Sequence, residues 1–202
     1  MTCAPAAAYI YRAAPVPEHR NQGGQRPRLE AQPWAGLARA ATDIYRPMLR
    51  RANLNDVELE YDPEPRGYGA GYRRIGPLVD AEETNLNVIL LNPGQAVCPY
   101  HYEYAEEWLL VLDGEVVVRT PNGEETAVRG DAVCFPAGPQ GAHKVANEGE
   151  GPARIVMFSS SRRPAVAVYP DSDKIGVFPP NPKDRAMLRR EDGQRDYWDR
   201  EQ

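Results

Sequence analysis

The segment from Pro99 to Glu115 places one histidine and several glutamates directly before an apolar run. Residues two apart on a β-strand project from the same face, so His101 and Glu103 are expected to point the same way. Glu107 keeps that parity if the strand continues. Imidazole and carboxylate groups gathered in this way suit a divalent first-row ion such as Mn, Fe, Ni, Co or Zn. His101, Glu103 and Glu107 are therefore candidate metal ligands.

A second polar cluster follows about forty residues later, between Gly130 and Asn147, and supplies His143. The chain has three histidines, and two of them lie in these two clusters. With His143, the candidate ligand set contains two imidazoles and two carboxylates. The competing interpretation is a solvated or hydrogen-bonded His-Glu pair that holds no metal, with the polar cluster binding a small ligand directly or having no role.

Cysteines and tyrosines border these candidates. Cys98 and Cys134 are expected to be small core residues rather than thiolate ligands. Tyr100, Tyr102 and Tyr104 alternate with the candidate ligands, so they are expected on the opposite face of the sheet, in the core or at a dimer contact.

Short apolar runs separated by turn signals must position these side chains. We expect strands at residues 85–91, 108–112, 115–120, 132–135, 143–146, 154–159 and 165–169. The Asn122-Gly123 pair indicates a tight hairpin, because both residues tolerate positive φ. Short strands at this spacing, with no long helix between them, predict an all-β sandwich or barrel.

Composition divides the chain into three parts. Residues 1–50 are rich in Ala, Pro, Arg, Gln and Gly without periodicity, which predicts a poorly ordered extension. Residues 51–178 carry the strand pattern and its turn-rich lead-in. Residues 179–202 form a charged tail, expected to pack on the barrel through Tyr197 and Trp198. One further hypothesis is that translation begins at Met48, where the extension meets the patterned region.

Charge and cysteine content narrow the function classes. The chain of 202 residues has a net charge of −5, and the excess of acids lies after the arginine-rich first quarter. An acidic body argues against nucleic acid as the main partner. No apolar run is long enough for a membrane helix, and no secretory signal is visible. Three cysteines form no disulfide framework, which favours the cytoplasm.

Together the two clusters resemble the two sequence motifs of the cupin superfamily. The first motif reads Gly94, His101, Glu103, Glu107 and Gly114. The second reads Gly130, Pro136, Gly138, His143 and Asn147. The resemblance covers residues 86–160, and the chain ending is similar to that of a group of uncharacterised bacterial cupin-domain proteins.

This resemblance implies a small double-stranded β-helix, or jelly-roll, barrel with irregular N-terminal and C-terminal extensions. The ligands would project into its mouth, with His101, Glu107 and His143 in the metal-binding places of the family. Glu103 stands where the family usually has a second histidine. Glutamate is a competent ligand, but it adds a negative charge and favours harder ions.

The expected function is a metal-binding cupin that binds or acts on a small polar molecule in the barrel. Isomerase, dioxygenase and decarboxylase chemistry all fit a metal that polarises or activates oxygen, and the sequence alone does not choose among them. The alternatives are a non-catalytic sugar or organic-acid sensor without metal, and a structural dimer with a packed barrel. Because exposed strand edges need covering, a homodimer is expected.

Overall fold

The structure is a computed structural model that describes residues 49–61, 67–193, 195–196 and 199–200. The predicted N-terminal extension falls outside these residues except for Leu49 and Arg50, and so does Met48. Tyr197 and Trp198 also lie outside the described residues. The domain boundaries drawn from the sequence therefore stay predictions.

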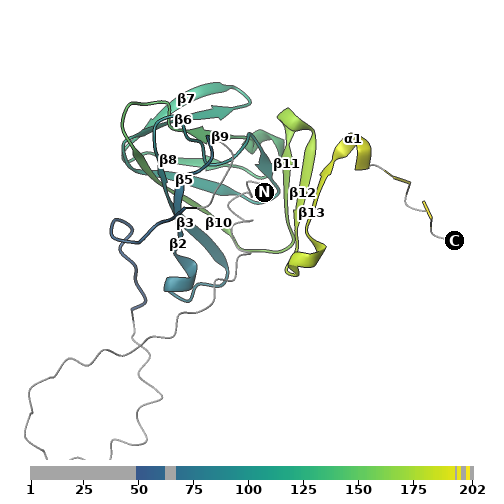
Figure 1. The fold of residues 1–202 in the computed structure, drawn as a ribbon, viewed down its shortest axis with the longest axis horizontal. Coiled ribbons are helices and arrows are strands. Elements are labelled where there is room, and N and C mark those ends of the chain that lie inside the picture. The colour runs from purple at the N-terminus through teal and green to yellow at the C-terminus, as the bar shows by residue number, and fades with distance from the viewer. Residues whose placement is uncertain (1–48, 62–66, 194, 197–198, 201–202) are drawn as a thin grey trace, which may run out of the picture.

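Strands dominate the described part of the chain (Figure 1). They are β1 (Glu60–Tyr61), β2 (Gly71–Arg74), β3 (Thr84–Leu91), β4 (Tyr102–Glu103), β5 (Glu107–Asp113), β6 (Glu115–Thr120), β7 (Gly123–Val128), β8 (Ala132–Phe135), β9 (Lys144–Ala146), β10 (Ala153–Ser160), β11 (Ala165–Tyr169), β12 (Lys174–Phe178) and β13 (Ala186–Arg189). Short 3-10 turns and the helix α1 (Arg190–Gly193) complete the elements. The prediction of an all-β chain without a long helix is confirmed.

Three antiparallel sheets build the fold. The largest has the order β1-β2-β3-β10-β5-β8, the second β7-β6-β9, and the third β13-β12-β11-β4. The first two sheets close into a jelly-roll barrel, and the third lies beside it (Figure 1). The barrel predicted from the sequence is thus confirmed. No helix among the described residues is long and apolar enough to cross a membrane.

The barrel core lies between the first two sheets. Leu91 of β3, Leu109 of β5 and Ile155 of β10 pack there against Val116 of β6 and Val145 of β9. Alternation sets this face: on β5, residues Glu107, Leu109 and Val111 are buried, whereas the side chains between them are more exposed. A second apolar layer around Val88 and Val156 covers the outer face of the large sheet.

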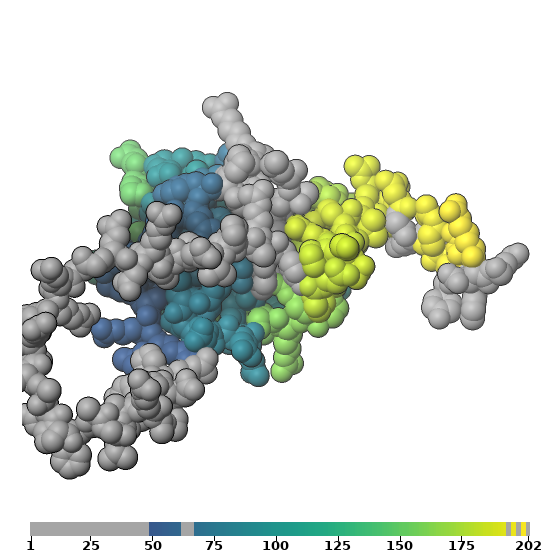
Figure 2. Space-filling view, turned by 60° about the horizontal axis from the view of Figure 1, so that its bottom comes forward, coloured from purple at the N-terminus to yellow at the C-terminus, as the bar shows by residue number. Residues whose placement is uncertain are grey.

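The C-terminal sheet begins inside the barrel domain and continues past its predicted end. The predicted boundary at 178 falls between β12 and β13, which pair with each other. Arg119 of β6 forms a two-point ion pair with Asp171, which follows β11, at 2.6 and 3.0 Å. This pair links the barrel to the third sheet. The described residues after β13 extend away from the barrel (Figures 1 and 2).

Candidate metal centre

Three buried side chains from three places in the chain meet inside the barrel. Glu107 is the first residue of β5, His101 lies just before β4, and His143 lies just before β9. The two histidines also form an antiparallel bridge, in which each backbone N–H donates to the other's carbonyl oxygen at 3.0 and 2.8 Å. The sheet register therefore fixes the two imidazoles next to each other.

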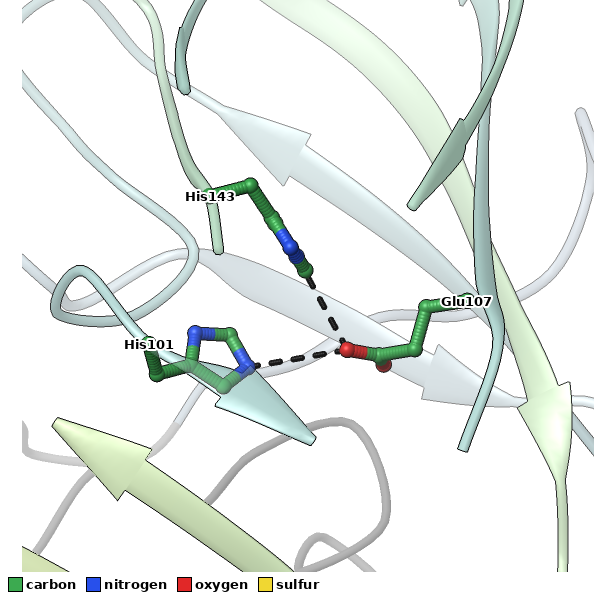
Figure 3. Close-up of side chains that lie close together, drawn as sticks. All are labelled: His101, Glu107 and His143. Atoms are coloured by element: carbon green, nitrogen blue, oxygen red, sulfur yellow. Dashed lines mark ion pairs between the residues drawn. The ribbon is translucent and has the colours of Figure 1, made fainter. Parts of the chain in front are cut away.

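The ligand atoms converge on one point (Figure 3). Nε2 of His101 lies 3.6 Å from Oε2 of Glu107, and Nε2 of His143 lies 3.7 Å from the same oxygen. One ligand atom from each residue falls within 4.8 Å of the others. Both imidazole-carboxylate distances are too long for a hydrogen bond. They are close to the spacing of about 3–3.5 Å between neighbouring ligands that each lie about 2.0–2.2 Å from one ion.

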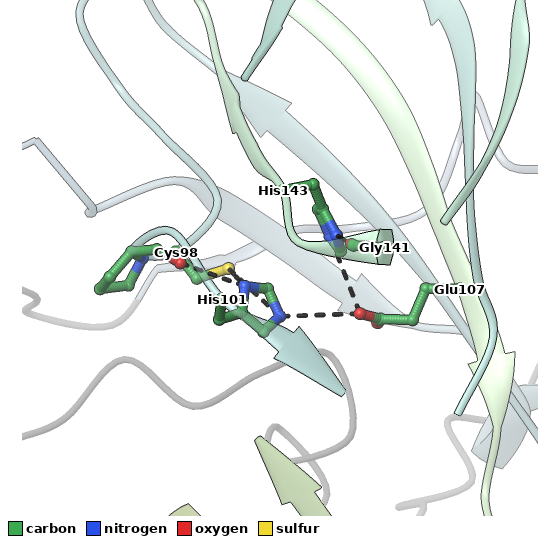
Figure 4. Close-up of polar contacts among 6 residues, drawn as sticks. Cys98, His101, Glu107, Gly141 and His143 are labelled. Carbon is green, nitrogen blue, oxygen red and sulfur yellow. Dashed lines mark hydrogen bonds and ion pairs between the residues drawn. The ribbon is translucent and has the colours of Figure 1, made fainter. Parts of the chain in front are cut away.

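Backbone carbonyls orient both imidazoles (Figure 4). Nδ1 of His143 lies 2.8 Å from the oxygen of Gly141, and Nδ1 of His101 lies 3.1 Å from the oxygen of Pro99. A carbonyl only accepts, so this network assigns the proton of each ring to Nδ1. Each Nε2 then presents a bare lone pair toward Glu107. Metal-binding histidines are oriented by the same kind of outer contact.

The centre is buried, and three of its polar atoms lack partners. His101, Glu107 and His143 are each at most 2% exposed. Both carboxylate oxygens of Glu107 and Nε2 of His143 make no hydrogen bond in the structure. Buried polar atoms are normally paired, so such a group indicates a missing partner. Two bare imidazole nitrogens and a carboxylate are a donor set that fits a divalent first-row ion.

The electrostatics of the three residues favour a neutral imidazole beside an ionised carboxylate. Burial, with a smaller contribution from His101, lowers the pKa of His143 to about 4. Burial raises the pKa of Glu107, but His101 and, to a smaller extent, His143 outweigh it when their rings carry a proton, and they hold that pKa below its ordinary value. These are the protonation states in which both groups can bind a cation.

Glu103, the fourth candidate ligand, is buried but does not belong to this close group. It sits on β4, where its backbone oxygen accepts a 2.7 Å hydrogen bond from Gly138. Burial, together with the negative charge of Glu107, raises its pKa well above the ordinary value, and Arg163 opposes that shift. Glu103 is thus an electrostatic neighbour of the centre, and its Oε1 makes no hydrogen bond.

The loop before β9 needs a glycine to place His143. A Cβ on Gly141 would lie 1.8 Å from the oxygen of Pro136, so no other residue fits there without moving the loop. Asn147, the last residue of the second motif, has a structural role. Its side chain donates to the oxygens of Leu91 and Gly151, both at 2.8 Å. It ties β9 to β3 and is not a ligand.

Ring contacts hold the imidazoles from behind, and the motifs did not indicate them. Phe135 stacks on His143 with the ring centres 3.6 Å apart and the planes at 8°. Tyr169 stacks on His101 at 5.8 Å. Phe135 ends β8 and Tyr169 ends β11, and both strands were predicted from the sequence. The alternation along these strands could have placed both rings on the inner face.

The cysteines differ from each other. Cys98 is buried, as predicted, but its sulfur also lies 3.4 Å from Nδ1 of His101. The prediction that Cys134 is a core residue is wrong, because its side chain is exposed. Cys134 pairs with Trp108, whose side chain is also exposed, on the outer face of the sheet.

The tyrosines are only partly where the sequence placed them. Tyr100 is buried, with the guanidinium of Arg119 4.0 Å above its ring. Tyr102 is partly buried and Tyr104 is exposed. They contact each other edge to face.

An open cavity of about 710 Å³ lies beside Glu103, and the three residues of the centre do not line it. Glu103 and Ser159 line it on the side of the barrel interior, and Tyr104 and Trp108 line its outer part. Its volume lies within the range typical of small-molecule sites.

Comparison with known proteins supports a family assignment. Residues 87–159 match the family model for the cupin domain. The tetracenomycin polyketide synthase protein TcmJ of Streptomyces glaucescens is 32% identical over 105 residues, which are 52% of this chain and 66% of that protein. The chain thus spans slightly less than two thirds of that relative.

Solved structures share the fold. A sugar phosphate isomerase of the cupin superfamily from Silicibacter pomeroyi is 25% identical, with a TM-score of 0.61 over 74% of this chain and 98% of that one. An Acidithiobacillus ferrooxidans protein assigned as a sugar phosphate isomerase is 21% identical, with a TM-score of 0.63 over 70% and 91%. The second likeness shows the fold alone.

Proposed function

We propose that the barrel of this chain, whose residues 87–159 match the cupin-domain family model, binds a divalent metal ion and acts on a small polar molecule. The ligands are His101, Glu107 and His143. The observation that supports this most strongly is the convergence of two bare Nε2 atoms on an unpaired carboxylate oxygen, at 3.6 and 3.7 Å, in a buried site.

A bound ion of the Mn-to-Zn series would supply a Lewis acid that polarises a ligand oxygen. The residues of the chain supply the rest. Pro99 and Gly141 hold the imidazoles in one tautomer through their carbonyl oxygens. Glu103 has a carboxyl that burial helps to keep protonated, so it can hold or release a proton beside the centre.

Isomerisation of a carbonyl compound is the reaction class that we favour. It needs one proton moved between neighbouring carbons and an oxygen whose developing charge is stabilised. Glu103, on which the charge of Glu107 acts, would move the proton, and the centre would stabilise the oxygen. The similarity to a sugar phosphate isomerase and to a polyketide synthase protein supports carbonyl substrates. Dioxygenase or decarboxylase chemistry would use the same centre.

Metal content tests the proposal directly. Untagged protein, analysed by mass spectrometry after incubation with Mn, Fe, Ni, Co or Zn and removal of excess ion, is expected to retain about one equivalent. His101→Ala and His143→Ala are expected to lose it. His19→Ala, which removes the third histidine, is the matched control and should retain it. No retained ion under any of these conditions would contradict the proposal.

Glu103→Gln separates two roles for that residue. A fall in metal content would make Glu103 a fourth ligand, as its place in the sequence motif suggests. Unchanged metal content with loss of turnover on a library of sugars and carbonyl compounds would make it the group that moves the proton.

The second candidate is a sensor that binds its ligand without metal or turnover. The open cavity of about 710 Å³ beside Glu103 favours it, because a small molecule could enter there without the centre. Ligand binding by metal-free protein, with no turnover by the loaded form, would support it. The cytoplasmic location and the homodimer stay predictions, to be checked by cell fractionation and by light scattering.

A further inference from the structure

Two rows of side chains cross the inner face of the large sheet beside the centre. The strand registers define one row, Asn85, Ser159, Glu107 and Phe135. The same registers define the neighbouring row, Arg74, Asn87, Met157 and Leu109. Glu107 therefore shares its row with the polar residues Asn85 and Ser159. Two more, Arg74 and Asn87, lie in the next row.

Arg74 points into the barrel, whereas the arginine before it points out. Tyr72, two residues earlier on β2, belongs to the barrel core, and residues two apart share a face. Arg73 instead forms a 2.6 Å ion pair with Glu60, and its register partner Val88 belongs to the outer apolar layer. The pair Arg73 and Arg74 thus places one cation on each side of the sheet.

Two polar side chains of the rows carry atoms without partners, whereas Asn85 donates to the backbone oxygen of Ser160 at 3.1 Å. Nδ2 of Asn87 and Oγ of Ser159 are buried and make no hydrogen bond in the structure. The guanidinium of Arg74 makes no hydrogen bond or ion pair with the residues that the structure describes, although the charge of Glu60 acts on it. Unpaired buried donors are rare in folded proteins, and a ligand that accepts hydrogen bonds would satisfy them.

An open cavity of about 400 Å³ lies over Arg74, Asn85 and Asn87, and Arg163 closes it from the C-terminal side of β10. The guanidinium of Arg163 donates to the backbone oxygen of Phe178 at 3.3 Å, and its charge also acts on Glu103.

Two acids border the same cavity, Asp80 and Glu82. Both are exposed, and Asp80 already lies 3.8 Å from the guanidinium of Arg50. Solvent screens them, whereas Arg74 is partly buried. The inner end of the cavity is therefore cationic and rich in donors.

We propose that Arg74, Asn87 and Arg163 form an anion subsite that binds a carboxylate or phosphate group of the molecule held at the metal centre. This inference rests on the proposed function for the other end of that molecule. β2 and β5 are three strand spacings of about 4.8 Å apart, so the anionic group and the group held at the centre would lie at opposite ends of the bound molecule. The substrate class is then a small carbonyl acid or a sugar phosphate, rather than a neutral sugar.

Calorimetric titration of metal-free protein with inorganic phosphate and, separately, with malonate tests the subsite without the centre. We expect binding of at least one of them, and the tighter one identifies the anionic group. Arg74→Gln is expected to weaken binding about tenfold or more, because it removes charge-assisted hydrogen bonds. Asn87→Asp, which keeps the size but adds a negative charge, is expected to abolish it.

Arg73→Gln is the matched control, since it removes the neighbouring but outward arginine, and it should bind as the wild type does. Unchanged affinity in Arg74→Gln, an equal loss in Arg73→Gln, or no binding of either anion by the wild type would each overturn the subsite. Circular dichroism melting shows whether each variant is folded. Metal content of the same preparations separates the two proposals, because Arg74→Gln should keep its metal if the centre exists.

Discussion

Glu103 is a buried carboxyl group whose ionised form is disfavoured in the folded protein. Its pKa is raised because burial and the charge of Glu107 oppose ionisation. The folded state therefore holds a proton that the unfolded chain releases near pH 4.5, so this group lowers stability as the pH rises from about 4.5 through its folded pKa. Above that range the loss is complete.

Glu103→Gln should consequently stabilise the metal-free protein at neutral pH. The gain should be about 1–3 kcal/mol, the usual cost of an unsatisfied buried polar group, and it should vanish near pH 4. Urea unfolding at both pH values measures it. Glu106→Gln, at an exposed neighbouring position, should change stability by less than about 0.5 kcal/mol. A less stable Glu103→Gln protein at pH 7 would contradict the account.

His143 should make the metal-free protein sensitive to acid. Its folded pKa is about 4 against an ordinary value of 6.5, so the unfolded chain binds a proton that the folded protein does not. Stability is therefore lost as the pH falls from about 6.5 to 4, by about 3 kcal/mol. Glu107, whose pKa is lowered, adds to the loss at the acid end, whereas Glu103 acts in the opposite sense.

Unfolding measured across this range in EDTA-treated protein should show the slope, and His143→Gln should flatten it. An equally steep profile in that variant would mean that the acid sensitivity has another source.

At the residue scale, the sequence identified the close group but not its support. Spacing and glycine framework indicated His101, Glu107 and His143, because ligand residues must follow the strand period. The strand parity also placed Glu103 on the same face as these residues. Parity predicts the face of a side chain but not its distance from the other ligands, which depends on how the sheets curve. The sequence alone could not place the proposed anion subsite, because Arg74 and Asn87 become neighbours only through the β2–β3 register.

Gly141 is the position at which the loop before β9 depends most on a single residue. Gly141→Ala would bring a methyl group against the backbone oxygen of Pro136, a contact that only a shift of the loop can relieve. We expect a loss of about 2–4 kcal/mol, together with weaker metal binding because the carbonyl of Gly141 orients His143. Thermal melting and metal titration measure the two effects.

Gly151→Ala is the matched control for this substitution, because a Cβ there meets nothing within 4 Å. Equal effects of the two substitutions would mean that the contact with Pro136 is not what makes Gly141→Ala costly.

Strands were predictable where an apolar face alternates with turn residues. The expected ranges 115–120, 132–135 and 165–169 coincide with β6, β8 and β11. β7 was missed as a strand because its first four residues are exposed, three of them polar and one a glycine, and only pairing with β6 makes it extended. β13 was assigned to a charged tail for a similar reason. β13 is extended because it pairs with β12, and such pairing cannot be predicted from the local composition.

For the whole molecule, the proposed centre lies where the sheets meet. Glu107 belongs to the large sheet, His143 adjoins the sheet of β9, and His101 adjoins β4 of the third sheet. An ion held by all three would join these sheets, and the unfolded chain has no such site. Metal should therefore stabilise the complete fold and not only the loops around the centre.

Binding at a hundredfold excess over the dissociation constant contributes about 2.7 kcal/mol. For a chain of this size each kcal/mol raises the melting temperature by about 2–4 °C, so a rise of about 5–10 °C is expected when EDTA-treated protein is loaded. Scanning calorimetry at several ion concentrations measures it, and the rise should grow with the logarithm of concentration. Glu107→Gln keeps the size of the side chain but removes the negative charge that both imidazoles face. Most of the metal-dependent rise in melting temperature should therefore be lost in this variant. The same rise in Glu107→Gln would mean that the ion binds elsewhere, whereas a rise lost there and retained in His19→Ala would locate the stabilising ion at the junction of the three sheets.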